Sequence, residues 1–390
     1  MRTAAALLLA AATAAAQTPA DILESHNAAL AYSAAAACMV RPTDEQVSLG
    51  SKITSGEIPW DEKALGPFLD ANWEALHLLR EGSRAPFCGF HLDISLGLSM
   101  PLPHLGQMRM LSRINAWDAC RGLALSRGLD AADALIAGLR LAAHLGSDGP
   151  IIQALVANAI LGITTEPLHR GISGRLFDVP TMRRIESALR DLPPDVADWN
   201  RAMAGERACV RAELDRIQAA TDPESFFASI QGISPEGEED GPGRKRTALD
   251  LAIAKQMFRT WGDDYLKFFD RQARALALPW PEAETETRRL EKRLPKEGVM
   301  TRILAPVLGD LNQSRGRAAA ARAGLIALCA VARAEETAGE DCISLDGLDV
   351  PPDPFTGESF CLERTADGYE IIPAGRTGDG KLIVYRLKAR

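Results

Sequence analysis

Three long helical patterns separated by very short breaks constrain the fold of this chain more than any other feature. Leu102–Arg127 carries apolar residues at the spacing of one helix face, and Ala131–Leu145 repeats that pattern after the break at Gly128–Asp130. A second break at Asp148–Pro150 precedes a third helical pattern over Ile151–His169. Because such short breaks favour helices that fold back on one another, the sequence predicts antiparallel αα-hairpins.

The rest of the chain as far as residue 340 continues in helical patterns. Ala and Leu are abundant, aromatic residues make up only 5%, and β-branched residues are sparse, which favours helices that pack closely. We interpret Thr43–Pro59 and Gly232–Arg246 as loops, and we expect Pro67 to disturb the helix that contains it. Further helices are predicted over Pro19–Val40, Pro59–Arg80, Asp178–Leu192, Asp195–Ala220, Leu249–Leu278, Glu282–Leu294, Met300–Asn312 and Gly316–Thr337. The prediction is a mostly α fold, an irregular antiparallel helical array forming one domain over residues 17–340.

The last fifty residues change in character. Pro351–Gly357 is too rich in proline and glycine to form a helix, and Ser359–Arg364, Tyr369–Ile372 and Lys381–Leu387 are β-prone runs separated by turn residues. We therefore expect a small antiparallel β appendage over residues 341–390. Its two phenylalanines, Phe355 and Phe360, are expected to hold it against the helical body.

The first sixteen residues have the layout of a secretory signal peptide. Arg2 provides a positive start, Ala4–Ala12 is a short apolar run, and Ala14–Ala16 offers small residues for cleavage before Gln17. The apolar run is too short to span a bilayer. We therefore expect an exported protein, periplasmic or extracellular, whose signal peptide covers residues 1–16.

The composition also limits the partners of this chain. A net charge of −8 argues against nucleic acid and against anionic lipid surfaces. The most apolar later run, Ala323–Ala332, is flanked by arginines and has half the length of a membrane span, so it is predicted to be a buried core helix. We expect no transmembrane segment after signal cleavage and an unknown protein or envelope component as partner. No phosphate-binding or dinucleotide-binding motif is present, and no cofactor is expected.

Seven cysteines remain to be explained, and an odd number leaves at least one thiol free or paired between chains. None forms a C-x-x-C motif, which argues against zinc knuckles and thioredoxin-like chemistry. Cys342 and Cys361 flank a turn-rich segment, and an oxidising compartment would favour a disulfide between them.

Two E-x-x-H pairs are the main candidates for metal binding. Glu74 with His77, and Glu166 with His169, place a carboxylate and an imidazole on one face of a helix. Two such pairs with two further glutamates hold the metals of di-iron carboxylate bundles. The two additional glutamates are missing from the neighbouring helical patterns, so a metal-dependent enzyme is the alternative hypothesis rather than the leading one.

Other polar groups have structural interpretations that compete with functional ones. Cys88, His91 and Asp93 could form a nucleophilic set, but residues this close in a loop rarely converge, and a structural loop is favoured. His104 follows a proline and is expected at a helix start with its ring hydrogen-bonded. Four arginines spread along one helix are interpreted as a solvated face: Arg109, Arg113, Arg121 and Arg127.

Three stretches of the chain together carry a resemblance. Pro86–Asp93, the helix that begins at Pro103, and Gly128–Leu145 together resemble a group of exported helical bacterial proteins common in Planctomycetes, whose chains end in a P-x-D-P-F-T-G segment matched here by Pro352–Gly357. That tail is similar to the C-terminal end of type II secretion major pseudopilins. The resemblance implies no activity, and without a prepilin N-terminus it does not imply assembly into a pilus.

In some pseudopilins the terminal loop binds calcium. The nearby carboxylates here, Asp367 and Asp379, both lie in Asp-Gly turns that need no metal. The leading functional hypothesis is a non-enzymatic, exported cell-envelope binding or scaffold protein. The alternative is a metal-dependent periplasmic enzyme that uses the two E-x-x-H pairs.

Overall fold

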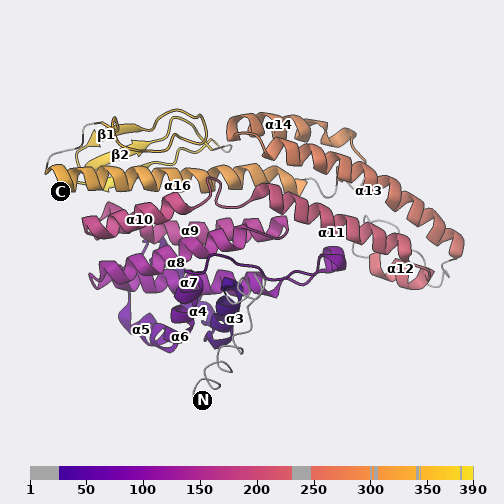
Figure 1. The fold of residues 1–390 in the computed structure, drawn as a ribbon, viewed down its shortest axis with the longest axis horizontal. Coiled ribbons are helices and arrows are strands. Elements are labelled where there is room, and N and C mark those ends of the chain that lie inside the picture. The colour runs from indigo at the N-terminus through magenta and orange to yellow at the C-terminus, as the bar shows by residue number, and fades with distance from the viewer. Residues whose placement is uncertain are drawn as a thin grey trace, which may run out of the picture.

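The computed structural model describes residues 26–230, 247–298, 301–302, 306–339, 342, 344–377 and 380–389. The predicted signal peptide and the predicted loop Gly232–Arg246 lie outside these residues. The described chain is mostly α-helical and ends in a small antiparallel sheet, as predicted. Figure 1 shows an elongated molecule in which the helices lie in layers along the long axis.

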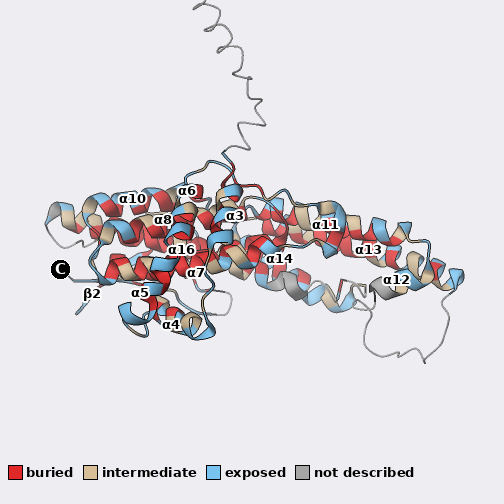
Figure 2. Ribbon diagram, turned by 90° about the horizontal axis from the view of Figure 1, so that it is seen from below, coloured by how far each residue is buried: buried red, intermediate tan, exposed pale blue. Residues whose placement is uncertain are grey.

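The centre of the fold is the predicted helical array. Its helices are α7 (Pro103–Ala124), α8 (Gly128–Gly146), α9 (Ile151–Ser173), α10 (Val179–Asp191) and α16 (Pro306–Ala338). They bury one continuous apolar core, and the red segments of Figure 2 follow their inward faces. Short breaks of three or four residues separate α7 from α8 and α8 from α9, so these helices run antiparallel.

Shorter helices cover one side of the array, and a helical arm extends from it. The covering helices are α3 (Ala28–Cys38), α4 (Asp44–Ser55), α5 (Glu62–Ala71) and α6 (Trp73–Gly82), whereas the 3-10 helix η1 (Ile94–Ser99) packs on the first helix of the arm. The arm contains α11 (Trp199–Ala219), α12 (Pro223–Ile230), α13 (Ala248–Leu276), α14 (Trp280–Arg293) and the 3-10 helix η2 (Leu294–Lys296). The arm has its own apolar cluster, in which α11 packs on α13.

Three expectations about the helices were wrong. The predicted loop Thr43–Pro59 contains α4, because Thr43 and Gln46 form a reciprocal capping box that starts a helix. The predicted helix Pro59–Arg80 is two helices, and the break is at Asn72 rather than at Pro67, which lies inside α5. The two helices predicted on either side of residues 313–315 are one continuous helix, α16.

Asn72 explains the break between α5 and α6. Its side chain is almost fully buried, its amide nitrogen donates to the Phe68 carbonyl, and its amide oxygen accepts from the backbone N–H of Val40. A side chain that bonds the backbone in this way competes with the regular helical hydrogen bonds. The bond to Val40 also ties the chain after α3 to this corner.

The C-terminal sheet packs on the helical body, as the two phenylalanines suggested. Strands β1 (Cys361–Thr365), β2 (Gly368–Ile372) and β3 (Tyr385–Lys388) form an antiparallel sheet in that order. Phe360 joins the central core, and the Phe355 ring meets the Trp280 ring of α14 at 4.7 Å between centroids. In Figure 1 the sheet lies over one half of α16 and α14 over the other.

A buried carboxylate organises the segment before the sheet. Asp353 is fully buried, and its carboxylate accepts hydrogen bonds from the backbone N–H groups of Phe355 at 3.0 Å and Gly375 at 2.6 Å. The resemblance to pseudopilin tails drew attention to Asp367 and Asp379 instead. Asp367 is exposed in the turn between β1 and β2, and Asp379 lies outside the described residues.

One described helix, α9, is long and apolar enough to cross a membrane by length and composition alone. Its apolar character was not noted in the sequence, where Ile151–His169 is predicted only as a helix of the array. Half of its most apolar window is buried, and it packs against α7, α8, α11 and α16. The run Ala323–Ala332 is buried within α16, which confirms its prediction as a core helix.

Candidate functional site

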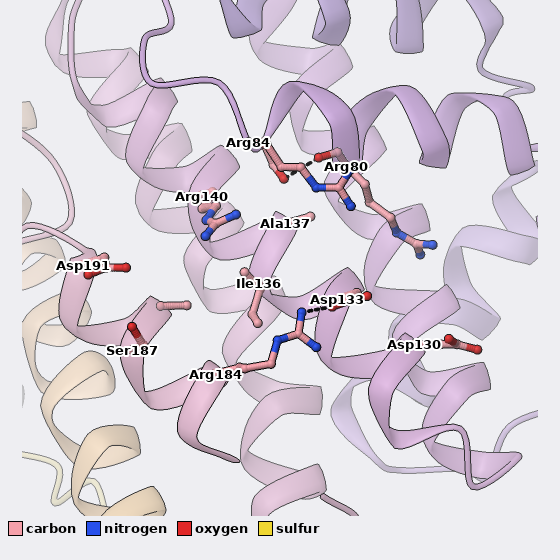
Figure 3. A pocket seen from close by; sticks show the side chains of 12 residues that line it. Arg80, Arg84, Asp130, Asp133, Ile136, Ala137, Arg140, Arg184, Ser187 and Asp191 are labelled. Atoms are coloured by element: carbon pink, nitrogen blue, oxygen red, sulfur yellow. Dashed lines mark hydrogen bonds and ion pairs between the residues drawn. The ribbon is translucent and has the colours of Figure 1, made fainter. Parts of the chain in front are cut away.

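A cleft of about 460 Å³ opens between α6, α8 and α10 (Figure 3). Each helix contributes a polar stripe at helical spacing, three, four or seven residues apart, on the face opposite to its core residues. The charged side chains that line the cleft are Arg80, Arg84, Asp130, Asp133, Arg140, Arg184 and Asp191. Ser83 and Ser187 add hydroxyl groups, and Ile136, Ala137 and Ala188 add a small apolar surface.

Three of the four arginines in the cleft have carboxylate partners. Arg184 and Asp133 form an ion pair of 2.5 Å that joins α10 to α8. Arg80 pairs with Asp118 of α7, and Arg84 pairs with Glu81. Within the described part of the chain, Arg140 makes no hydrogen bond and no ion pair.

Arg140 lies one turn of α8 before His144, and the His144 ring is hydrogen-bonded to the buried Tyr32. Tyr32 of α3 is fully buried, and its hydroxyl lies 2.8 Å from Nδ1 of His144. Burial lowers the pKa of His144, and the Arg140 charge lowers that pKa further. An imidazole carries no negative charge in either protonation state, so His144 does not compensate Arg140. The guanidinium of Arg140 is left available to a ligand in the cleft.

A second hollow of about 270 Å³ adjoins the cleft along α6 and shares Arg80 and Asp130 with it. Trp73 lines this hollow with 66% of its surface exposed, and its ring lies 6.2 Å from the His77 ring. We refer to the two hollows together as the charged groove. Its lining combines guanidinium, carboxylate and aromatic groups, of which arginine and aromatic residues are enriched at protein interfaces.

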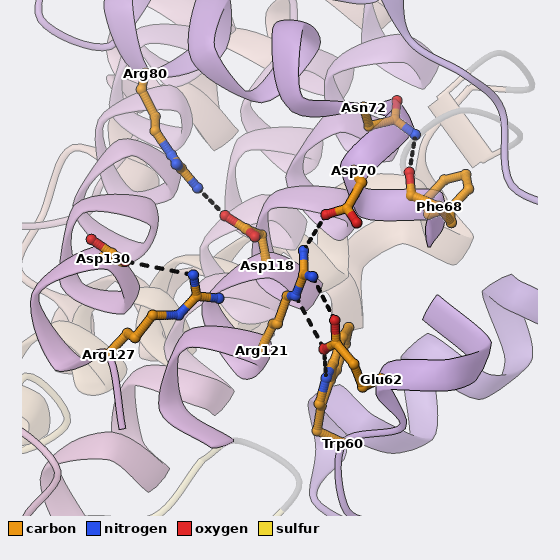
Figure 4. A network of polar contacts seen from close by, with 10 residues as sticks. All are labelled: Trp60, Glu62, Phe68, Asp70, Asn72, Arg80, Asp118, Arg121, Arg127 and Asp130. Atoms are coloured by element: carbon orange, nitrogen blue, oxygen red, sulfur yellow. Dashed lines mark hydrogen bonds and ion pairs between the residues drawn. The ribbon is translucent and has the colours of Figure 1, made fainter. Parts of the chain in front are cut away.

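Arg121 holds one wall of the charged groove in place (Figure 4). Its guanidinium bonds Asp70 at 2.6 Å and Glu62 at 2.5 Å, and Trp60 donates to the same Glu62 carboxylate at 2.8 Å. These bonds, from Arg121 first and Trp60 second, lower the pKa of Glu62. The expectation that all four arginines form a solvated face was wrong for Arg121, because it is the anchor between α5 and α7.

The other three arginines of that set agree better with the expectation. Arg109 and Arg127 are exposed, and Arg127 lies 3.9 Å from Asp130 at the edge of the charged groove. Arg113 is half-buried. Burial and the neighbouring Arg109 charge lower the pKa of Arg113.

The structure does not bring the two E-x-x-H pairs together, so the predicted dinuclear centre is not formed. Glu74 and His77 are exposed on α6. On α9, Glu166 is exposed, whereas His169 is turned to the sheet, where its Nε2 accepts from the Arg386 backbone N–H at 3.3 Å. Among the described residues, no group of three or more His, Cys, Asp and Glu side chains could hold a metal ion. The physical reason is that α6 packs mainly on α3 and leaves Glu74 and His77 exposed, whereas the His169 side chain of α9 is turned to the sheet.

The possible nucleophilic set does not converge either. Cys88 is buried, and burial, followed by the nearby Asp148 charge, raises the pKa of its thiol to about 12. His91 is exposed, and Asp93 accepts hydrogen bonds from the backbone and side chain of Ser95. The structural interpretation of this loop is therefore confirmed.

His104 also has the structural role that the sequence suggested. It lies in the first turn of α7, its ring stacks on Phe90 at 4.2 Å, and its Nε2 lies 3.1 Å from the Gln153 amide oxygen. Burial lowers the pKa of His104, so its ring is a neutral part of the core.

The predicted disulfide is not formed, and all seven cysteines are free. The Cys342 thiol is half-buried after α16 and donates to the Ser344 carbonyl at 3.1 Å. Cys361 begins β1 with its side chain exposed. The turn-rich segment between them packs on the core without a covalent link, through Leu345, Leu348 and Val350.

Comparison with known protein families, with curated proteins and with solved structures finds no match to this chain.

Proposed function

We propose that this chain is an exported cell-envelope binding or scaffold protein, and that a peptide segment of its partner occupies the charged groove. The observation that carries the proposal is the guanidinium of Arg140 in this cleft, which has no carboxylate partner among the described residues. A guanidinium presents a planar fork of donors that matches a carboxylate. A partner carboxylate at Arg140 would form a charge-assisted hydrogen bond contributing about 1.5–3 kcal/mol.

The carboxylates of the cleft narrow the choice of partner. Asp191 faces the cleft from α10, and like Arg140 it makes no ion pair within the described residues. A simple polyanion would be repelled by Asp130, Asp133 and Asp191, whereas a peptide segment with charges of both signs could satisfy both kinds of group. The exposed Trp73 ring adds an apolar contact farther along the groove.

The state of the possible catalytic groups supports binding rather than chemistry. Burial raises the pKa of the Cys120, Cys209 and Cys342 thiols, which disfavours reactive thiolates. In the cleft, the Ser83 hydroxyl donates to the Arg80 carbonyl and is therefore already engaged. The metal-dependent enzyme remains without a supporting observation, because its four proposed ligands lie on separate surfaces.

Site-specific photocrosslinking in living cells tests the proposal. A photoreactive amino acid at Ser187, inside the cleft, should give one discrete adduct with an envelope protein, and Arg140→Glu in the same chain should abolish it. The matched control carries the photoreactive residue at Arg109, which is exposed on α7 outside the cleft. Identical adduct patterns at the two positions, or an adduct that survives Arg140→Glu, would refute the assignment of the groove.

Export is tested separately by sequencing the N-terminus of the mature protein. The proposed signal peptide predicts a chain that begins at Gln17 or a near neighbour. An intact Met1 on protein recovered from the cytoplasm would refute export without bearing on the groove.

A further inference from the structure

Another hollow lies at the end of the arm that adjoins α16, and it has a very different balance of charge. It has a volume of about 340 Å³ and lies between the C-terminal turns of α13 and the second half of α14. Four arginines and one carboxylate line it, over a floor of Ala275, Leu278 and Leu290. We call it the arginine groove; its charged members are Arg271, Arg274, Glu286, Arg289 and Arg293.

Two of these guanidiniums are matched by carboxylates. Arg271 pairs with Glu297 at 3.0 Å, and its guanidinium lies 5.2 Å from the centre of the Phe268 ring. Arg289 pairs with Glu286 at 3.3 Å. These interactions fix two positive groups on opposite sides of the apolar floor.

The other two guanidiniums lack a carboxylate partner within the described residues. Arg274 donates only to the Asp270 carbonyl of its own helix at 3.2 Å, and Arg293 makes no hydrogen bond or ion pair there. Both side chains are exposed, one on each helix. Each lies in the last turn of its helix, where a cation interacts favourably with the helix dipole. That interaction explains each arginine singly, but it does not explain why both border one apolar groove.

We propose that the arginine groove binds an acidic peptide segment that carries an apolar side chain between its carboxylates. The apolar side chain would lie on Ala275 and Leu290, and carboxylates on either side of it would reach Arg274 and Arg293. The groove is about two helical turns long on each helix, or about 11 Å, which matches three or four residues of an extended peptide. The two arginines come from different helices that border the apolar floor, an arrangement that suits two carboxylates on either side of an apolar side chain.

The chain's own acidic run is too far away to be the occupant. Glu238–Asp240 precedes α13, and the nine residues from Glu238 to Thr247 span at most about 32 Å when extended. Arg274 lies twenty-six residues beyond the first residue of α13, which is about 39 Å along the helix. The acidic segment must therefore come from another chain.

The test uses the full chain and three synthetic probes measured by fluorescence anisotropy. The probes are a labelled EDLLEE peptide, an EDGGEE peptide that lacks the apolar side chains, and a labelled oligothymidine with the same number of negative charges. We expect EDLLEE to bind at least about tenfold more tightly than EDGGEE and than oligothymidine.

The variant Arg274→Glu with Arg293→Glu should weaken EDLLEE binding by at least about tenfold. The matched control is Lys267→Glu with Lys292→Glu, which makes the same change in charge on the same two helices outside the groove. This control should weaken binding less than about threefold, since it alters only the long-range field. Circular dichroism of both variants, and a neutral Arg274→Gln with Arg293→Gln variant, separate loss of binding from loss of fold.

Three results would each overturn the proposal. In the first, the two charge-reversed pairs weaken EDLLEE binding equally. In the second, EDLLEE and EDGGEE bind with equal affinity. In the third, oligothymidine binds more tightly than EDLLEE. The last result would make the groove a nucleic-acid site instead. Because the arginine groove and the charged groove share no residue, either can fail without the other.

Discussion

The hydroxyl of Tyr385 in β3 donates a hydrogen bond of 2.8 Å to the Ala320 carbonyl in α16. The Tyr385 ring lies directly over Gly324, one helical turn farther along, where a Cβ atom would come within 2.0 Å of a ring carbon. The absence of a side chain at Gly324 therefore lets the last strand approach the central helix closely. This contact joins the C-terminal sheet to the core of the molecule.

Replacing Gly324 by Ala should destabilise the fold by about 1–3 kcal/mol, because the added methyl group must displace a buried aromatic ring. The matched control is Gly106→Ala in α7, where a Cβ atom meets nothing within 4 Å. That change should stabilise the protein by up to about 1 kcal/mol through helix propensity. Urea denaturation followed by circular dichroism measures both, and effects of the same sign would contradict the close contact.

Replacing Asp353 by Asn should lower the free energy of unfolding by about 1–3 kcal/mol. The Asn amide cannot accept from both backbone N–H groups that the carboxylate satisfies, and one donor would be left buried. Asp367→Asn, in the exposed turn after β1, should change the free energy of unfolding by less than about 0.5 kcal/mol. Thermal denaturation of the two variants provides the comparison, and equal losses would count against the role of Asp353.

The buried Tyr32–His144 pair predicts a stability that falls in mild acid. Burial, assisted by Arg140, holds the pKa of His144 below its ordinary value of about 6.5. As the pH falls through about 6.5, the unfolded chain takes up a proton at this position while the folded chain does not, so unfolding becomes easier. The contribution is fully present above that pH and is lost towards the lower folded pKa.

His144→Gln should therefore show a smaller loss of stability than the natural chain between pH 7.5 and pH 5.5. The difference is at most about 1.4 kcal/mol per pH unit from this one group. Burial also lowers the pKa of His104 and His169, and both remain in the variant, so part of the acid sensitivity persists. Urea denaturation at the two pH values gives the comparison. Identical losses in both proteins would exclude His144 as a source.

Thiol labelling of the folded protein shows whether Cys342 and Cys361 are free thiols or form a disulfide. Cys38 and Cys361 are exposed and should react with a maleimide within minutes, whereas Cys329, which is fully buried in α16, should react only after unfolding. Peptide mapping by mass spectrometry identifies the labelled positions. A Cys361 that stays unlabelled until reductant is added would instead support the disulfide that the sequence suggested.

Two features of the helices differ from the prediction, and only one of them has a local signal in the sequence. The segment that forms α4 is predicted as a loop, although Thr43 and Gln46 carry a capping-box signal. The break at Asn72 was different, because it depends on a hydrogen bond to Val40, thirty-two residues away in the chain. Local signals could have revealed the first, whereas the second needs a contact between distant residues.

In the candidate sites too, some features follow from local spacing and others need contacts between distant residues. The stripe of Asp130, Asp133, Ala137 and Arg140 on α8 can be read from helical spacing alone. Its meeting with the stripes of α6 and α10 could not, because spacing says nothing about which neighbouring face a stripe will oppose. The two E-x-x-H pairs do not meet for this reason: each has the right spacing within its helix, but Glu74 and His77 are exposed on α6, whereas His169 of α9 is turned to the sheet.

The sequence by itself determined the antiparallel hairpins of α7, α8 and α9, the buried run within α16 and the three C-terminal strands, because apolar periodicity and turn residues act over a few neighbouring positions. Only the tertiary structure decided that Arg121 is an anchor, that Arg140 has no carboxylate partner within the described ranges, and that Arg274 and Arg293 border one groove. The physical reason is that pairing of charges depends on contacts between helices distant in the chain. Those contacts follow from how the apolar faces pack, and charge spacing along one helix does not encode them.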